Sequence, residues 1–121
     1  MQFVVGPASV AQTTPVPVLL VRVVVEGESM SPTLVPGDRL LVVRTRRVRR
    51  GDLVALVDPR EPGRTIVKRV DRVEGDAVTV LGDNLGASTD SRVFGPVDRR
   101  DVRGRAIYRY WPEDRRGRLT R

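Results

Sequence analysis

Short runs of valine, leucine and isoleucine, each ended by glycine, proline or charged residues, dominate the chain between residues 17 and 111. Runs of this length, rich in β-branched side chains, are typical of β-strands. They predict strands over residues 17–26, 39–45, 53–59, 64–73, 77–83 and 103–111. Turns are predicted between them, at 60–63 among others, and an irregular loop over 84–97. This spacing predicts a mainly β fold of short strands, a barrel or a sandwich-like domain.

The pattern also predicts the domain boundaries. Residues 1–15 show no sustained periodicity and are expected to be a loose leader, residues 16–112 one domain, and residues 113–121 a basic, flexible tail. The longest apolar run, 16–25, is too short to cross a bilayer and contains an arginine. The start of the chain lacks the basic region of a secretory signal. We therefore expect a cytoplasmic protein without a membrane anchor.

Composition narrows the possible chemistry. The 121 residues include no cysteine and no histidine. Disulfides, thiolate chemistry, histidine-ligated metals and Ser-His-Asp triads are therefore excluded, and we expect neither a metal nor a cofactor. Any acid–base catalysis near neutral pH needs a carboxylate, a tyrosine or a lysine with a shifted pKa.

Lys68 is the only lysine among 22 basic side chains. In the predicted strand it shares a face with Ile66 and Val70, and burial there would lower the pKa of its amine. Arginine cannot replace a neutral amine, because its guanidinium stays protonated. The alternative is that Lys68 extends to solvent from a half-buried strand and has no chemical role.

Ser29 is a candidate nucleophile for such an amine. It follows the predicted strand 17–26, in a turn rich in glycine and proline, and a neutral lysine can activate a serine hydroxyl. Most serines in turns are only caps or solvated hydroxyls, and we assign no chemistry to the neighbouring Ser31. Position alone does not decide between the two interpretations.

Four segments, in order, resemble the conserved boxes of type I signal peptidases, which are serine proteases with a Ser–Lys dyad on a largely β fold. They are ESMSPTLVPGDRLLV (28–42), RGDLVAL (50–56), VKRV (67–70) and LGDNLGASTDSRVFGPV (81–97). The resemblance implies a compact core of short, mostly antiparallel strands, arranged as a barrel or as coiled sheets. It also implies that Ser29 is the nucleophile and supplies a backbone N–H to the oxyanion hole. It makes Lys68 the general base and Ser88 the residue that orients the lysine. It places structural support near the site at Gly27, Met30, Arg69, Asp83, Asn84 and the ion pair Asp90–Arg92.

Three departures from the family pattern matter. Gly27 stands where some members carry a serine that donates to the oxyanion. The N-terminal membrane anchor of signal peptidases is not expected here, and only residues 71–81 separate the lysine box from the GDN at 82–84, where the family usually has a substantial insert. The sequence of residues 82–97 and the RYWP at 109–112 resemble those of the soluble maturation proteases that remove the propeptide of nickel-type superoxide dismutase. The resemblance thus implies a serine endopeptidase that binds a protein substrate in extended form, for example a superoxide dismutase precursor.

Three alternatives stay open. The enzyme could be signal peptidase-like and cleave other precursors. A self-cleaving repressor-type peptidase also uses Ser–Lys, but the chain has no Ala-Gly bond of the kind those proteins cut. The net charge of +7 and RTRRVRR (44–50) also fit a non-catalytic β-barrel that binds nucleic acid. That basic run holds no aromatic residue on which bases could stack, so we expect no nucleic-acid partner and an acidic substrate protein at this turn instead.

Overall fold

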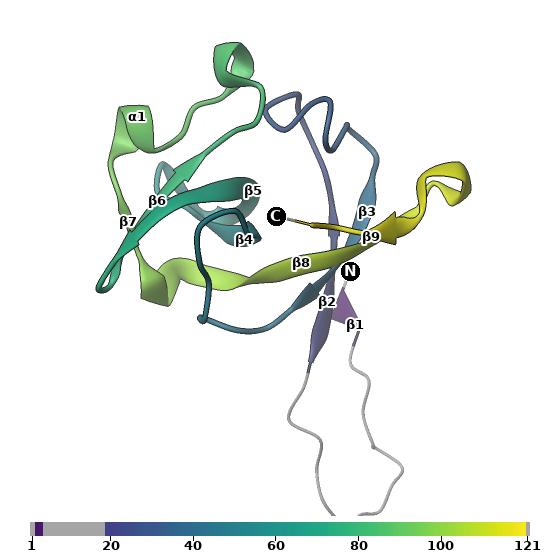
Figure 1. The fold of residues 1–121 in the computed structure, drawn as a ribbon, viewed down its shortest axis with the longest axis horizontal. Coiled ribbons are helices and arrows are strands. Elements are labelled where there is room, and N and C mark those ends of the chain that lie inside the picture. The colour runs from purple at the N-terminus through teal and green to yellow at the C-terminus, as the bar shows by residue number, and fades with distance from the viewer. Residues whose placement is uncertain (1, 4–18, 121) are drawn as a thin grey trace, which may run out of the picture.

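The computed structural model describes Gln2–Phe3 and residues 19–120 as one coiled antiparallel sheet with little helix (Figure 1). The strands are β1 (Gln2–Phe3), β2 (Leu20–Val24), β3 (Arg39–Val43), β4 (Leu53–Asp58), β5 (Glu61–Glu74), β6 (Ala77–Leu81), β7 (Val97–Asp98), β8 (Val102–Trp111) and β9 (Gly117–Arg118). The helical elements are η1 (Leu85–Ala87), α1 (Ser91–Phe94), η2 (Arg99–Asp101) and η3 (Glu113–Arg115). The strand order is β1-β2-β3-β8-β4-β5-β6-β7, with β9 on β8, and every pair is antiparallel. The predicted mainly β class is therefore confirmed.

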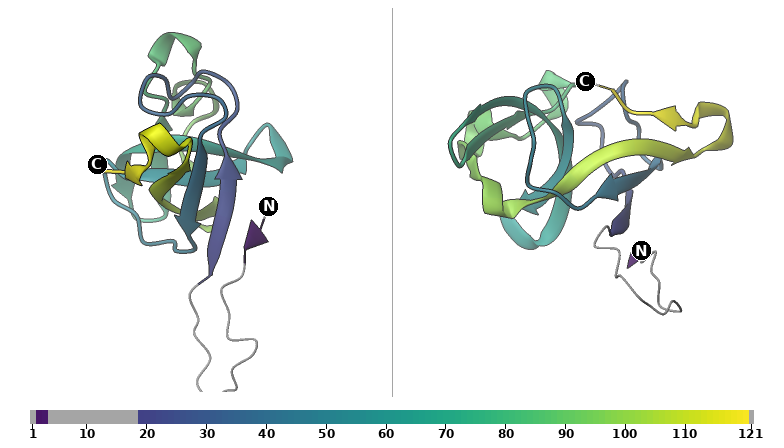
Figure 2. Two further views of the ribbon diagram at one scale, coloured as in Figure 1. Left: turned by 90° about the vertical axis from the view of Figure 1, so that its right-hand side faces the viewer. Right: turned by 60° about the horizontal axis from the view of Figure 1, so that its bottom comes forward.

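Strand β8 joins the two halves of the sheet. Its first part pairs with β4 and the part that follows pairs with β3, and Figures 1 and 2 show it running between the two halves. At Gly104 the backbones come so close that a Cβ would lie 2.7 Å from Val42 Cγ1 and nearer still to the Val43 carbonyl oxygen. Only glycine permits this approach. The close crossing lets one continuous sheet coil around itself.

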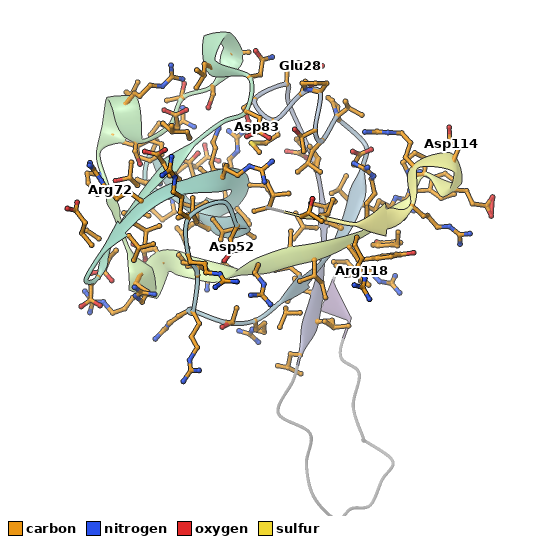
Figure 3. The ribbon with its side chains drawn as sticks, viewed as in Figure 1. Glu28, Asp52, Arg72, Asp83, Asp114 and Arg118 are labelled. Atoms are coloured by element: carbon orange, nitrogen blue, oxygen red, sulfur yellow. The ribbon has the colours of Figure 1, made fainter. Side chains whose placement is uncertain are left out.

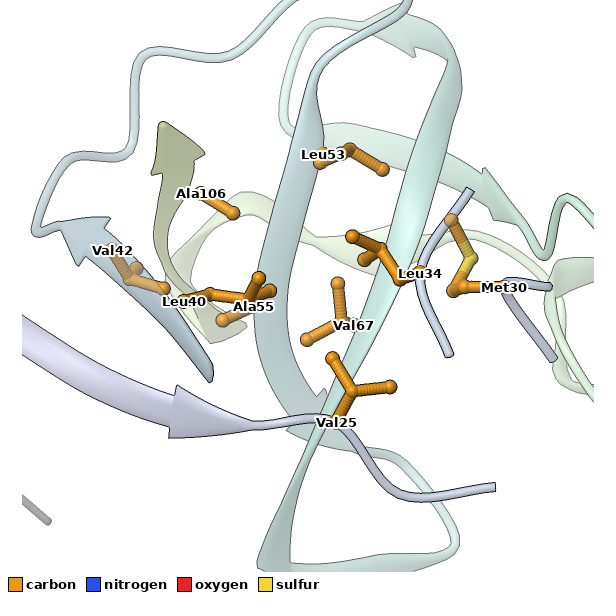
Figure 4. Packing of buried hydrophobic residues seen from close by; sticks show 9 residues of the cluster. All are labelled: Val25, Met30, Leu34, Leu40, Val42, Leu53, Ala55, Val67 and Ala106. Atoms are coloured by element: carbon orange, nitrogen blue, oxygen red, sulfur yellow. The ribbon is translucent and has the colours of Figure 1, made fainter. Parts of the chain in front are cut away.

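The coiled sheet has two hydrophobic cores, and β4 supplies both. Leu53 and Ala55 belong to the first cluster, whereas Val54 and Leu56 belong to the second, as the alternation of side chains along a strand requires. The first cluster, drawn in Figure 4, includes Val25, Met30, Leu34, Leu40, Val42, Val67 and Ala106. The second includes Val48, Ile66, Val70, Val78, Val80, Val97 and Val102. Buried side chains of the 25–38 loop thus pack directly against the sheet.

Four local predictions differ from the structure, two within the domain and two at its ends. The turn expected at 60–63 is shorter, because the Arg60 N–H bonds to the Asp58 carboxylate at 2.9 Å and the chain is already in β5 at Glu61. The loop over 84–97 contains η1, α1 and β7.

The segment expected to be a flexible tail contains η3 and β9, because its backbone pairs with β8 and Leu119 packs against the first cluster. Of the expected leader, Gln2–Phe3 pairs with β2. The rest of the leader, and residue 121, lie outside the described residues.

Candidate active site

Lys68 lies in the middle of β5, with its side chain buried. It is only 4% exposed, on the face that carries Ile66 and Val70, as the alternation along the strand predicted. Its Nζ donates to Ser88 Oγ at 3.0 Å. Burial lowers the pKa of Lys68, and the nearby negative charge of Asp90 opposes part of that shift. The amine is thus closer to its neutral form than an exposed lysine would be.

Ser88 connects Lys68 to a buried carboxylate. Its hydroxyl accepts from Lys68 and donates to Asp90 Oδ2 at 2.7 Å. Asp90 is fully buried and also accepts from the Gly82 N–H at 2.9 Å and from Arg92, whose Nε lies 2.9 Å from Oδ1. Burial alone would raise the pKa of Asp90, but the hydrogen bonds from Arg92, Gly82 and Ser88 hold it far below its usual range. The carboxylate stays ionised at neutral pH and fixes the direction of the Ser88 hydroxyl.

Ser29 lies in the loop that follows β2. The chain enters this loop through Gly27, whose φ of 74° is in the left-handed region that favours glycine. Two backbone bonds then fold it into a tight turn, from the Ser31 N–H to Glu28 O at 3.1 Å and from the Leu34 N–H to Met30 O at 3.0 Å. The turn holds Ser29, which is partly exposed, at the end of the sheet.

The turn after β6 forms hydrogen bonds with the backbone of the Ser29 loop. The Asn84 N–H donates to the Ser29 carbonyl at 2.8 Å, and Asn84 Nδ2 donates to Glu28 O at 3.1 Å. A Cβ at Gly82 would lie 2.6 Å from that same Ser29 carbonyl and nearer still to the Ser88 side chain. Gly82 therefore allows the Ser29 loop to approach Ser88 closely.

Arg69, Asp83 and Met30 support this junction. Arg69 holds Asp83 with two bonds, Nε to Oδ1 at 3.2 Å and Nη2 to Oδ2 at 2.7 Å, and the Asp83 N–H faces Met30 Sδ at 3.4 Å. Met30 itself is 2% exposed. Figure 3 shows Asp83 and Glu28 at the same end of the molecule, where the two loops meet. All ten residues that the sequence analysis assigned to the site or its support thus lie in this region.

Ser29 and Lys68 open into one groove, with a cavity volume of about 240 Å³. The end of β2 and the loop after it form one wall, residues 64–67 of β5 form the other, and Ala87 and Thr89 close it. Within the described part of the chain, the Ser29 hydroxyl and Lys68 Nζ share this groove without a hydrogen bond between them. No group of three or more acidic side chains that could hold a metal ion occurs in residues 2–3 and 19–120.

One buried polar cluster was not anticipated from the sequence. Asp38, 1% exposed, forms ion pairs with Arg109 at 3.1 Å and Arg115 at 2.7 Å. Its partners lie 71 and 77 residues away along the chain, where sequence spacing gives no signal.

A comparison with known protein families identifies the region that contains these site residues. The profile of the family described as signal peptidase, peptidase S26, matches residues 2–81 and 71–111. Mitochondrial inner membrane protease subunit 2 of Mus musculus is 38% identical, over 78% of this chain and 69% of its own length. Mitochondrial ATP-independent inner membrane protease subunit 1a of Arabidopsis thaliana is 37% identical, over 78% and 73%. Subunit 1 of the Homo sapiens inner membrane protease is 32% identical, over 74% and 69%.

These relatives correct one prediction. The cytoplasmic location expected from the sequence is wrong, because the relatives are named as proteins of the mitochondrial inner membrane. No helix in the described ranges is long and apolar enough to cross a membrane. None of these three names mentions superoxide dismutase, so that finer assignment stays a prediction. The family profile covers nearly the whole chain, and the chain belongs to the signal peptidase S26 family of peptidases.

Proposed function

We propose that the chain is a serine endopeptidase in which Ser29 is the nucleophile and Lys68 the general base. The observation that carries this proposal is the position of Lys68 Nζ: buried, 3.0 Å from Ser88 Oγ, and in the groove that Ser29 also lines. A lysine with a lowered pKa next to a serine is one of the recognised ways to activate a hydroxyl without histidine. Ser88 and Asp90 orient the amine.

Acylation proceeds from neutral Lys68. Its amine takes the Ser29 hydroxyl proton while Oγ attacks the scissile carbonyl, and a tetrahedral oxyanion forms. The Ser29 N–H makes no hydrogen bond within the described part of the chain, which leaves it available to this oxyanion. When the intermediate collapses, the C–N bond breaks and Lys68 passes the proton to the leaving amine.

Hydrolysis of the acyl-enzyme repeats the proton transfers. Lys68, neutral again, takes a proton from water as the water oxygen attacks the ester carbonyl. The C–Oγ bond then breaks, and the proton returns from Lys68 to Ser29. One water is consumed for each peptide bond cleaved.

The walls of the groove suit an extended protein segment. Residues 23–24 of β2 pair only with β3 in the described part of the chain, and residues 65–68 of β5 pair only with β4. Each therefore presents an unpaired backbone edge to the groove, to which a peptide can add as a strand. We infer that the substrate is a precursor protein from which an N-terminal propeptide is removed, and nickel-type superoxide dismutase remains the named candidate.

Cleavage of a precursor tests the proposal. The purified protein is incubated with the nickel-type superoxide dismutase precursor and, separately, with precursors that carry other N-terminal extensions, and the new N-termini are sequenced. Lys68→Arg and Ser29→Ala should each lower turnover by roughly 10²–10⁴-fold with the fold intact by circular dichroism. Substantial turnover by folded Lys68→Arg would exclude Lys68 as the base. Cleavage of other precursors alone would exclude the superoxide dismutase assignment but not the peptidase.

A second candidate function rests on the arginine-rich turn. Arg44, Arg46, Arg47, Arg49 and Arg50 are all exposed. A non-catalytic nucleic-acid binder would use them, and its affinity would fall steeply with salt and be unchanged in Ser29→Ala. The Lys68–Ser88–Asp90 arrangement has no role in such a protein, so the peptidase explains more of the structure.

A further inference from the structure

The C-terminal strap, residues 113–120, lies wholly beyond the part of the chain that the family profile matches, which ends at residue 111. It consists of η3, β9 and the residues that follow, and Figure 3 labels Asp114 and Arg118 on it. None of its residues lines the groove. Its contacts nevertheless reach the loop that carries Ser29 and the strand that carries Lys68.

The first contact holds the 25–38 loop, which contains Ser29. Arg115 Nη1 donates to Asp38 Oδ1 at 2.7 Å, and Asp38 Oδ2 accepts from the Val35 N–H at 3.0 Å. A carboxylate as buried as Asp38 is stable only when it is paired, so the ion pairs fix the turn over 33–38. That turn continues directly from Ser29.

Arg109 strengthens this contact. Its Nε donates to the Arg115 carbonyl at 2.7 Å, and its Nη1 donates to both Asp38 Oδ2 and the Thr33 carbonyl. One guanidinium therefore joins β8, the strap and the Ser29 loop. This density of charged hydrogen bonds indicates a rigid junction.

The second contact holds the strand of Lys68. Arg69 Nη1 donates to the Thr120 carbonyl at 3.1 Å, while its Nη2 donates to Asp83. The residue after Asp83 binds the Ser29 carbonyl through its N–H. Leu119, between the two contacts, packs against the first hydrophobic cluster.

We propose that the C-terminal strap is a positioning element that sets Ser29 relative to Lys68, with Arg115 as its principal anchor. The inference rests on the proposed Ser29–Lys68 pair. Arg115 touches neither substrate nor reacting atoms, and it acts through Asp38 and the 33–38 turn. Loss of this anchor lets the Ser29 loop shift, and a displacement of about 1 Å can lower a rate by roughly a hundredfold.

The test uses a small ester, p-nitrophenyl acetate, because it reports the reacting pair without needing the peptide groove. The acetylation rate of Ser29 is followed by p-nitrophenolate release against pH, with Ser29→Ala as the blank. Arg115→Ala should lower the plateau rate by roughly ten- to a hundredfold with an unchanged midpoint of the pH profile. Arg115→Lys should recover part of the rate, because it keeps the charge but not the planar fork.

The matched control is Arg116→Ala, which removes an exposed arginine of the strap that forms no ion pair within the described ranges and should acetylate at the wild-type rate. All rates are measured well below each variant's melting temperature. If Arg115→Ala does not fold, Arg115→Gln replaces it. A folded variant that acetylates as fast as the wild type would overturn the strap proposal. A midpoint raised towards that of free lysine would overturn it too, because it would indicate general loosening around Lys68.

A wild-type protein without Ser29-dependent acetylation would instead overturn the Ser29–Lys68 pair, and the strap proposal with it. Normal acetylation of the wild type and of Arg115→Ala leaves the pair standing and overturns only the strap. The two failures are thus distinguishable.

Discussion

At the scale of single residues, the burial of Lys68 is the feature on which the proposed chemistry depends. Desolvation lowers the pKa of its amine from the ordinary 10.5, and Asp90 opposes this by favouring the charged form. A base with a lowered pKa is neutral over more of the physiological range. The pH–rate profile should therefore rise with pH on a limb below 10.5 and remain level above it.

Asp90→Asn tests this balance of charges. Removing the carboxylate removes the larger of two charge interactions that raise the pKa of Lys68, the other coming from Asp58, so the limb should move to lower pH. The plateau should fall, because the Ser88 hydroxyl loses its ionised acceptor. The measurement is the pH–rate profile, with Asp98→Asn, a partly exposed carboxylate on β7, as the control. A limb that stays in place or moves upward would contradict the assignment of Asp90 as the charge facing Lys68.

The direction of the Lys68 side chain could be predicted from the sequence, but its contacts with residues far along the chain could not. The alternation of β5 is enough to place Lys68 beside Ile66 and Val70, because side-chain direction follows from strand phase alone. The contact with Ser88 spans 20 residues, and only the family boxes indicated it. The ion pair between Arg115 and Asp38 could not be predicted, because ion pairs between residues far apart in the chain leave no local sequence pattern.

At the scale of elements, the active region depends on how closely two loops approach. Gly82→Ala would place a Cβ against both the Ser29 carbonyl and the Ser88 side chain. Relieving this overlap should cost roughly 1–3 kcal/mol of stability and displace one of the two serines, which lowers kcat. Thermal unfolding and turnover are measured together.

Gly86→Ala is the matched control for this substitution. It lies in η1, four residues further on, where an added Cβ would have open space. Stability and turnover should both stay near wild type. Equal effects of the two substitutions would contradict the importance of the close approach at Gly82.

The elements that sequence analysis missed share a physical cause. α1 is only four residues long, so it lacks a helical period and depends on the Asp90 side chain capping the Arg92 N–H. β9 is two residues long and consists of Gly117 and Arg118, neither with strand preference. It forms because β8 offers an edge to pair with, which is tertiary information. Longer strands with β-branched side chains, such as β4 and β5, were predicted well.

At the scale of the whole molecule, some of the surface arginines form ion pairs with carboxylates and others do not. Arg72 and Arg100 form ion pairs with Glu74 and Asp98 at 3.4 and 3.2 Å. In the described residues, Arg46 and Arg47 of the 44–50 turn form none. A cationic side chain that is not held in an ion pair is freer to contact an anionic partner. The turn should therefore dominate binding to polyanions.

Two double variants with the same change in net charge test this. Arg46→Gln with Arg47→Gln removes unpaired arginines, and Arg72→Gln with Arg100→Gln removes paired ones. Affinity for a short DNA duplex, used as a polyanionic probe, is measured against salt. The first double variant should lose about 0.9 unit of the log–log salt slope for each contact removed, and the second much less, because its arginines are already paired. Equal losses in both would mean that net charge alone, spread over the surface, governs the attraction, and that the turn is no distinct docking surface for an acidic partner.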